Sequence, residues 1–125
     1  MDNIALGKIG EEKALEYLKQ KGYKIFETDF RCRLGQLDIV AKDKNTLCFV
    51  EVKTRASLRL GLPQEAISTV KQHKISKVAL AYLKSHNLIK SRARFDIVSV
   101  ILKDSTIDKI ELIKDAFPLD ARYAY

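Results

Sequence analysis

The stretch from Leu47 to Lys53 constrains the fold of this chain more than any other segment. It has the sequence LCFVEVK, in which five apolar residues are interrupted by one glutamate before the closing lysine. A short, nearly continuous apolar run is typical of a strand in the middle of a sheet with both faces buried. Because such a sheet needs a covering layer on each side, we predict an α/β domain with a mixed central sheet flanked by helices.

The rest of the chain supplies further elements. Apolar residues recur at helical spacing from about Ile4 to Lys21, and Gly22 would end this helix. Pro63 suits the first turn of a second helix, which we extend to about His86. Strands are predicted over residues 23–30, 36–41, 47–53, 94–102 and 107–113. The predicted order of elements is therefore αβββαββ.

Length and composition indicate one domain over residues 1–125, with 46% hydrophobic residues to build its core. No apolar run approaches the about 20 residues that a membrane span requires. The amino-terminal segment has no signal-peptide pattern. Cys32 and Cys48 match no zinc-binding spacing, so we expect reduced structural thiols in a cytoplasmic protein.

The two strands before and after residue 44 carry acidic residues that would meet. Side chains alternate along a strand, so Glu51 and Lys53 share one face. A two-residue turn at Lys44-Asn45 would join these strands as an antiparallel hairpin and place Asp38 opposite Glu51. Opposed side chains begin about 5 Å apart at Cβ. The hairpin would therefore gather two carboxylates and an ammonium group on one face.

Such a cluster is unfavourable unless it binds a ligand. Two neighbouring carboxylates repel each other, and one of them is driven towards protonation. A magnesium ion, or manganese in its place, relieves this conflict because it prefers hard oxygen ligands and substrate phosphate. Lys53 beside the ion could hold the attacking water or stabilise charge at phosphorus. The alternative is an ordinary surface ion pair between Lys53 and Glu51.

A glutamate in the first helix points to the same cluster. The predicted apolar face comprises Ile4, Gly7, Ala14, Leu15 and Leu18. Glu11 falls in the middle of this face, where an unpaired carboxylate would be costly. Its simplest partner is the metal cluster, so we count Glu11 among the metal ligands. Alternatively, Glu11 lies at the exposed end of the face and reaches solvent.

The second helix shows the same anomaly with opposite sign. Its predicted apolar arc comprises Ile67, Val70, Val78, Ala81 and Tyr82. Lys71 and Lys74 fall inside this arc, and buried lysines need anions nearby, either the acidic cluster or phosphates. Lysine stems that extend to solvent are the alternative. With neighbouring side chains included, the candidate nucleic-acid contacts are Arg55, Arg59, Gln64, Lys71 and Lys74.

The positive charge of the chain is concentrated in one segment. The net charge is +7, and residues 51–94 alone contain ten Lys or Arg against two Asp or Glu. A localised positive face attracts phosphate backbones and accelerates association with them. We therefore expect a nucleic-acid partner, DNA in preference to RNA.

These residues also follow a known pattern. Asp38, twelve intervening residues and Glu51-Val52-Lys53 resemble the PD-(D/E)xK nuclease superfamily, which includes restriction enzymes and archaeal Holliday-junction resolvases. A longer string, from about Gly7 to Phe117, resembles the YraN-like family of predicted endonucleases. It comprises Gly10-Glu11 with Ala14 and Leu18, Gly22-Tyr23, Gly35-Gln36-Leu37-Asp38-Ile39-Val40, Phe49-Val50-Glu51-Val52-Lys53-Thr54-Arg55, Gly61-Leu62-Pro63-Gln64-Glu65-Ala66-Ile67, Lys71, Arg94-Phe95-Asp96-Ile97-Val98 and Ala116-Phe117.

The resemblance implies a restriction-endonuclease-like αβββαβ core with Glu11, Asp38, Glu51 and Lys53 in the active site. It further implies a magnesium-dependent endonuclease that hydrolyses phosphodiester bonds, and analogy with resolvases suggests branched DNA as substrate. A homodimer is one option for the assembly, because symmetric cleavage of two strands needs two sites. Gln36 departs from the family pattern, in which glutamate is usual, and removes a negative charge beside Asp38. The alternative function is therefore a nucleic-acid-binding module with little or no catalysis.

Overall fold

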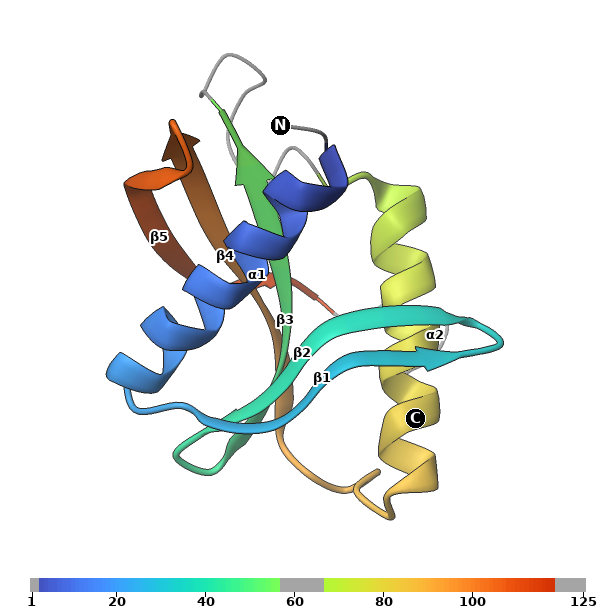
Figure 1. Cartoon of the computed structure of the whole chain (residues 1–125). Helices are drawn as coiled ribbons and strands as arrows, with labels where there is room; N and C mark the ends of the chain where they lie inside the picture. Colours follow the sequence, from blue (N-terminus) through green and yellow to red (C-terminus); the bar gives the residue numbers. More distant parts are fainter. Residues whose placement is uncertain (1–2, 57–66, 119–125) are drawn as a thin grey trace.

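The computed structural model describes residues 3–56 and 67–118, whose arrangement is shown in Figure 1. In these ranges, two helices and five strands follow the predicted order αβββαββ. The elements are α1 (Asn3–Gln20), β1 (Lys24–Cys32), β2 (Gly35–Asp43), β3 (Thr46–Arg55), α2 (Thr69–Ser85), β4 (Ala93–Lys103) and β5 (Thr106–Phe117).

The strands form one sheet in the order β1-β2-β3-β4-β5, with β3 in its centre. β3 pairs antiparallel with β2 and parallel with β4, and the two outer pairs are antiparallel. A parallel pair needs a crossover connection, and the segment between β3 and β4 contains α2. The predicted fold class is therefore confirmed: an α/β fold with a mixed sheet and an αβββαβ core, to which β5 adds an edge strand.

The central strand is buried on both faces. Phe49 of β3 packs in one apolar cluster with Val78 and Tyr82 of α2. Its neighbour Val50 packs in a second cluster with Ala14 and Leu18 of α1. Because successive side chains of a strand point to opposite faces, α1 and α2 cover opposite faces of the sheet.

The hairpin of β2 and β3 has the register that its turn predicts. Val40 lies opposite Phe49, and Ile39 lies opposite Val50. Lys44, the first turn residue, has a φ of 56°, a left-handed conformation that short hairpin turns require. The two-residue turn thus sets which side chains of the two strands meet.

The predicted start of the second helix needs correction. α2 begins at Thr69, because Ser68 is its N-cap and has the extended backbone conformation of a cap residue, with φ −63° and ψ 161°. The Ser68 hydroxyl accepts a hydrogen bond from the backbone N–H of Lys71 at 3.2 Å. Pro63, expected in the first turn, lies outside the part of the chain that the structure describes. The last strand is longer than predicted, because its end residue Phe117 is buried and stacks on Phe95.

The predicted apolar faces of both helices also need correction. Ile4 is exposed, and the buried face of α1 contains Ala14 and Leu18. Val70 is exposed as well. The buried residues of α2 are Ile75, Ser76, Val78, Ala79, Tyr82 and Leu83. The buried face of α2 is thus rotated about the helix axis relative to the prediction, which moves Lys74 out to solvent.

The β1–β2 hairpin extends past the sheet and crosses α2 (Figure 1). At its turn, Gly35 has a φ of 147°, and a Cβ added there would lie 2.9 Å from Cγ2 of Val78. A glycine at this position therefore allows both the backbone conformation and the close approach to α2. This contact places the start of β2 beside the helix.

Two further expectations concern the setting of the chain. Neither α1 nor α2 has an apolar stretch long enough to cross a lipid bilayer. Cys32 and Cys48 are both free thiols, and Cys48 is buried.

Candidate active site

Asp38 lies where β2 and β3 separate. The backbone ladder ends at the pair of Ile39 and Val50, one step before Asp38 would face Glu51. The Asp38 carboxylate instead accepts a hydrogen bond from the backbone N–H of Val52, with 2.9 Å between Oδ2 and the nitrogen. This bond gives the Val52 amide a hydrogen-bond partner at the point where the strands diverge, and it holds the Asp38 carboxylate against β3.

Glu51 is buried beside Asp38, with 5% of its surface exposed. Burial raises the pKa of the Glu51 carboxyl to about 8, and the negative charge of Asp38 and a hydrogen bond with it act in the same direction. The ammonium groups of Lys71 and Lys53 act against this increase. At neutral pH the two acids therefore share an environment that favours a proton or another cation.

Two lysines lie next to this acidic pair. Nζ of Lys71 is 3.8 Å from Oε2 of Glu51, and the Lys71 side chain is partly exposed. Burial lowers the pKa of Lys53, contact with Lys71 lowers it further, and the nearby carboxylates of Glu51 and Asp38 oppose the change. Lys53 and Lys71 are thus a like-charged pair beside the acidic pair.

Glu11 reaches the same region from α1. With Asp38, Lys53 and Lys71 it lines a cavity of about 310 Å³. Burial raises the pKa of Glu11, and the negative charges of Asp38 and Asp29 add to the effect. Its side chain is partly exposed, so Glu11 lies at the edge of the buried face of α1 and not in its middle.

Gly10 determines how closely α1 approaches β3. A Cβ added at Gly10 would overlap Oγ1 of Thr54 and lie 2.7 Å from the Cβ and Cγ2 atoms of the same residue. The absence of a side chain at Gly10 therefore lets the helix backbone rest on Thr54. This contact brings the next residue, Glu11, to the cavity that it shares with Lys53.

A second cavity, of about 320 Å³, lies between the start of β2 and α2. Its polar lining residues are Gln36, Asp38, Glu51, Lys71 and Lys74. Asp38 and Lys71 line both cavities, so the two cavities meet at these residues, whereas Glu51 lines the second cavity alone. Gln36 and Lys74 are exposed and form part of the rim.

The five predicted nucleic-acid contacts have different surroundings. Lys71 and Lys74 line the second cavity. Arg55 ends β3 with 8% of its surface exposed, so its guanidinium group is enclosed by protein. Arg59 and Gln64 lie outside the described residues. Of this set, two lysines of α2 therefore border the candidate site.

The acidic residues fit a divalent cation with two protein ligands. Within residues 3–56 and 67–118, no three His, Cys, Asp or Glu side chains are placed to hold one metal ion together. Asp38 and Glu51 still offer two carboxylates, and the adjoining cavities have room for water and phosphate oxygens. Magnesium is commonly held in this way, by one or two carboxylates with water and phosphate. Glu11 does not join Asp38 and Glu51 in a site of three carboxylates.

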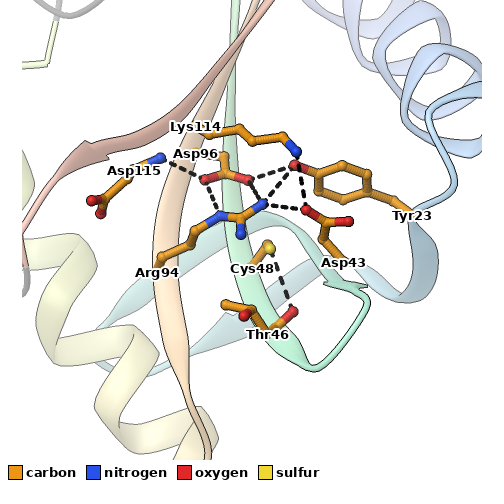
Figure 2. Close-up of polar contacts among 8 residues, drawn as sticks. All are labelled: Tyr23, Asp43, Thr46, Cys48, Arg94, Asp96, Lys114 and Asp115. Carbon is orange, nitrogen blue, oxygen red and sulfur yellow. Dashed lines mark hydrogen bonds and ion pairs between the residues drawn. The ribbon is translucent and has the colours of Figure 1, made fainter.

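Sequence reasoning missed a polar network at the opposite end of β3 (Figure 2). Asp96 of β4 is fully buried and accepts hydrogen bonds from the Tyr23 hydroxyl at 2.8 Å and from Nε of Arg94 at 2.9 Å. Arg94 also pairs with Asp43 at 2.7 Å, and Lys114 contacts Asp43 at 3.2 Å. The network ties β2, β4 and β5 to Tyr23, which lies between α1 and β1. An arginine and an aspartate two positions apart in an apolar strand were the signal in the sequence.

Comparisons with known proteins identify relatives over most of the chain. The model of the uncharacterised protein family UPF0102 matches residues 10–100. A UPF0102 protein of Syntrophus aciditrophicus is 50% identical over 117 residues, which are 94% of this chain and 91% of that protein. One of Trichlorobacter lovleyi is 50% identical, covering 94% and 93%. One of Caldicellulosiruptor saccharolyticus is 47% identical, covering 94% and 100%.

Among solved structures, Pyrococcus furiosus SfsA in complex with Ca²⁺ is similar with a TM-score of 0.41 and 18% identity. The match covers 83% of this chain and 62% of that chain.

Proposed function

This chain belongs to the uncharacterised protein family UPF0102, the YraN-like family that its motifs predict, and we propose that it is a magnesium-dependent endonuclease that hydrolyses phosphodiester bonds in DNA. One observation carries the proposal: two like-charged pairs, Asp38 with Glu51 and Lys53 with Lys71, lie side by side. Each pair is unfavourable on its own, and each is relieved by an ion of opposite charge. A phosphodiester that arrives with a divalent cation supplies both ions.

Each charged residue of the site then has a role. Asp38 and Glu51 would hold the magnesium or manganese ion, and Glu11 would orient water in the cavity that it shares with Asp38 and Lys53. The ion, when bound, supplies Lewis-acid stabilisation of the phosphoryl oxygens. Lys53 orients the attacking water, and Lys71 binds a non-bridging phosphate oxygen. In hydrolysis the water oxygen bonds to phosphorus, the bond to one ester oxygen breaks, and that oxygen leaves with a proton.

A second candidate function is a nucleic-acid-binding module with little or no catalysis. It is favoured by Gln36, which lines the cavity of Asp38 and Glu51 where a glutamate would add a third carboxylate. The fewer acidic ligands a site has, the weaker its hold on a divalent cation. In this case the lysines would still bind phosphates, and the acidic pair would stay largely without metal.

A cleavage assay with matched variants tests the proposal. Fluorescent single-stranded, duplex and four-way DNA are incubated with the protein in Mg²⁺, in Mn²⁺ and in EDTA. Cleavage should require metal and should fall by at least about 100-fold in Glu51→Gln and in Lys53→Ala. The controls Glu111→Gln and Lys109→Ala change exposed residues of β5 in the same way and should keep full activity.

Cleavage that persists in EDTA, or that survives both site substitutions, would contradict the enzymatic assignment. Binding of DNA with a steep salt dependence but without cleavage in either metal would identify the binding module.

We place the protein in the cytoplasm, because Cys32 and Cys48 are free thiols. Symmetric cleavage of a branched DNA would in addition require a homodimer, because two cuts need two copies of the Asp38–Glu51 site. Sedimentation of the protein alone and with four-way DNA measures whether two copies assemble.

A further inference from the structure

A groove continues from the candidate active site along α2. The cavity of Asp38 and Glu51 shares Leu34 with a neighbouring cavity of about 390 Å³. The lining of this neighbour comprises Leu34, Lys77, Leu80, Ala81 and Lys84. Lys84 in turn also lines a third cavity, of about 450 Å³, near the end of α2. Each cavity shares one lining residue with the next, so the three lie in a row from the acidic pair towards the end of α2, and we call this row the groove.

Beyond the active site the groove has a single sign of charge. Lys71 and Lys74 line the cavity of the acidic pair, and Lys77 and Lys84 follow them along α2, whose sequence contains no Asp or Glu. The described lining of the two outer cavities contains no acidic residue either. Lys74 and Lys84 are exposed, and the other two lysines are partly exposed. The groove is therefore complementary to a polyanion.

Between these lysines the groove is apolar. Leu34 is 47% exposed at the turn of the β1–β2 hairpin, which crosses α2 in Figure 1. Leu80 and Ala81 line the same cavity as Leu34. A duplex presents phosphates and sugars and keeps its bases stacked inside. An unpaired strand offers base faces as well, and these gain from contact with apolar side chains.

We propose that this groove binds an unpaired nucleic-acid strand and leads it to the active site. The lysines of α2 contact phosphates, and Leu34 packs against a base. This inference rests on the proposed function and specifies its substrate class. The distance along α2 from Lys71 to Lys84 is about 20 Å at about 1.5 Å per residue. A strand in a duplex rises about 3.4 Å per nucleotide, and an unstacked strand is more extended, so the groove accommodates at most about six nucleotides.

The test measures binding alone, in EDTA, so that catalysis plays no part. Fluorescence anisotropy compares labelled oligothymidylates of increasing length with duplexes of equal length. Affinity for the single strand should rise steeply with length up to at most about six nucleotides and more slowly beyond. The triple variant Lys74→Ala, Lys77→Ala, Lys84→Ala should bind at least tenfold more weakly and reduce the salt slope by about 2.

Leu34→Ala isolates the contact with the base. It should weaken binding of the single strand severalfold and leave duplex binding unchanged. Its matched control is Ile107→Ala, at an exposed residue of β5 (41% exposed), and Lys109→Ala is the control for charge. Both controls should bind as the wild-type protein does. Melting temperatures of all variants check that the substitutions leave the fold intact.

Equal affinity for single strand and duplex, or unchanged binding in the triple variant, would overturn the groove proposal. The proposed function would survive that result if metal-dependent cleavage were observed. A wild-type protein that neither binds nor cuts any nucleic acid would contradict both.

Discussion

The Oδ2 atom of Asp38 lies 2.9 Å from the backbone nitrogen of Val52 and accepts its hydrogen bond. The bond forms where β2 leaves β3, one step beyond the last backbone pair of the hairpin. Glu51 immediately precedes Val52, and where the strands separate Asp38 lines both cavities and Glu51 lines one of them. The candidate site depends on this local end of strand pairing as much as on its charges.

Two substitutions separate the structural role of Asp38 from its proposed ligand role. Asparagine keeps an oxygen for the Val52 N–H, so Asp38→Asn should stay within about 1 kcal/mol of the wild-type stability. Asp38→Ala leaves that amide unpaired and should lose about 1–3 kcal/mol. Both variants should lose binding of Mn²⁺. Urea unfolding and calorimetric titration measure the two effects, and equal stability of the variants would argue against the structural role.

The raised pKa of Glu51 predicts a pH-dependent effect of Glu51→Gln. The carboxyl has a pKa of about 8 in the folded protein, against an ordinary value of 4.5. Its contribution to stability is therefore fully present below about pH 4.5 and is lost as the pH rises towards 8. Glutamine cannot ionise, so the variant should become progressively more stable than the wild type over this range. Urea unfolding in EDTA at several pH values measures the difference in free energy of unfolding between Glu51→Gln and the wild type. A difference that stays constant with pH would contradict the prediction.

The sequence predicts the parts of this site that depend on local pattern. The turn at Lys44-Asn45 fixes the register of the hairpin, and the apolar run around Phe49 identifies the central strand. The rotation of α2 is not encoded locally, because Val70 looks as suitable for burial as Ile75 until the helix docks on the sheet. For the same reason the exposure of Lys74 could not be predicted.

The proximity of Lys53 and Lys71 likewise depends on tertiary packing. Lys53 belongs to β3 and Lys71 to α2. The predicted helix start at Pro63 did not determine how this helix lies relative to β3. The charge pattern of residues 51–94 indicated a basic surface, but it could not show that two lysines meet beside Glu51.

The contact of α1 with β3 predicts opposite effects for two glycines of the same helix. Gly10→Ala would drive a methyl group into Thr54 and should destabilise the protein by about 1–3 kcal/mol. Gly7 has no atom within 4 Å of an added Cβ, so Gly7→Ala should stabilise the helix by up to about 1 kcal/mol. Thermal unfolding of both variants measures this. Destabilisation by both, or by neither, would be inconsistent with the described packing.

Gln36 predicts a gain in metal affinity on substitution. The side chain is exposed at the cavity of Asp38 and Glu51, so the fold should tolerate a change there. Gln36→Glu adds a carboxylate and should tighten Mn²⁺ binding severalfold, whereas Gln36→Lys should weaken it. Calorimetric titration of the two variants decides this. Identical affinities in both would show that the ion binds elsewhere.

Asp38 and Glu51 together should bind a divalent cation. A crystal structure of the protein soaked in Mn²⁺, with anomalous differences measured, tests it most directly. An anomalous peak should lie between the two carboxylates, with the Glu51 side chain turned towards it. A peak at another site, or none at saturating Mn²⁺ while Glu51 keeps its contact with Lys71, would show that Asp38 and Glu51 do not bind the ion together.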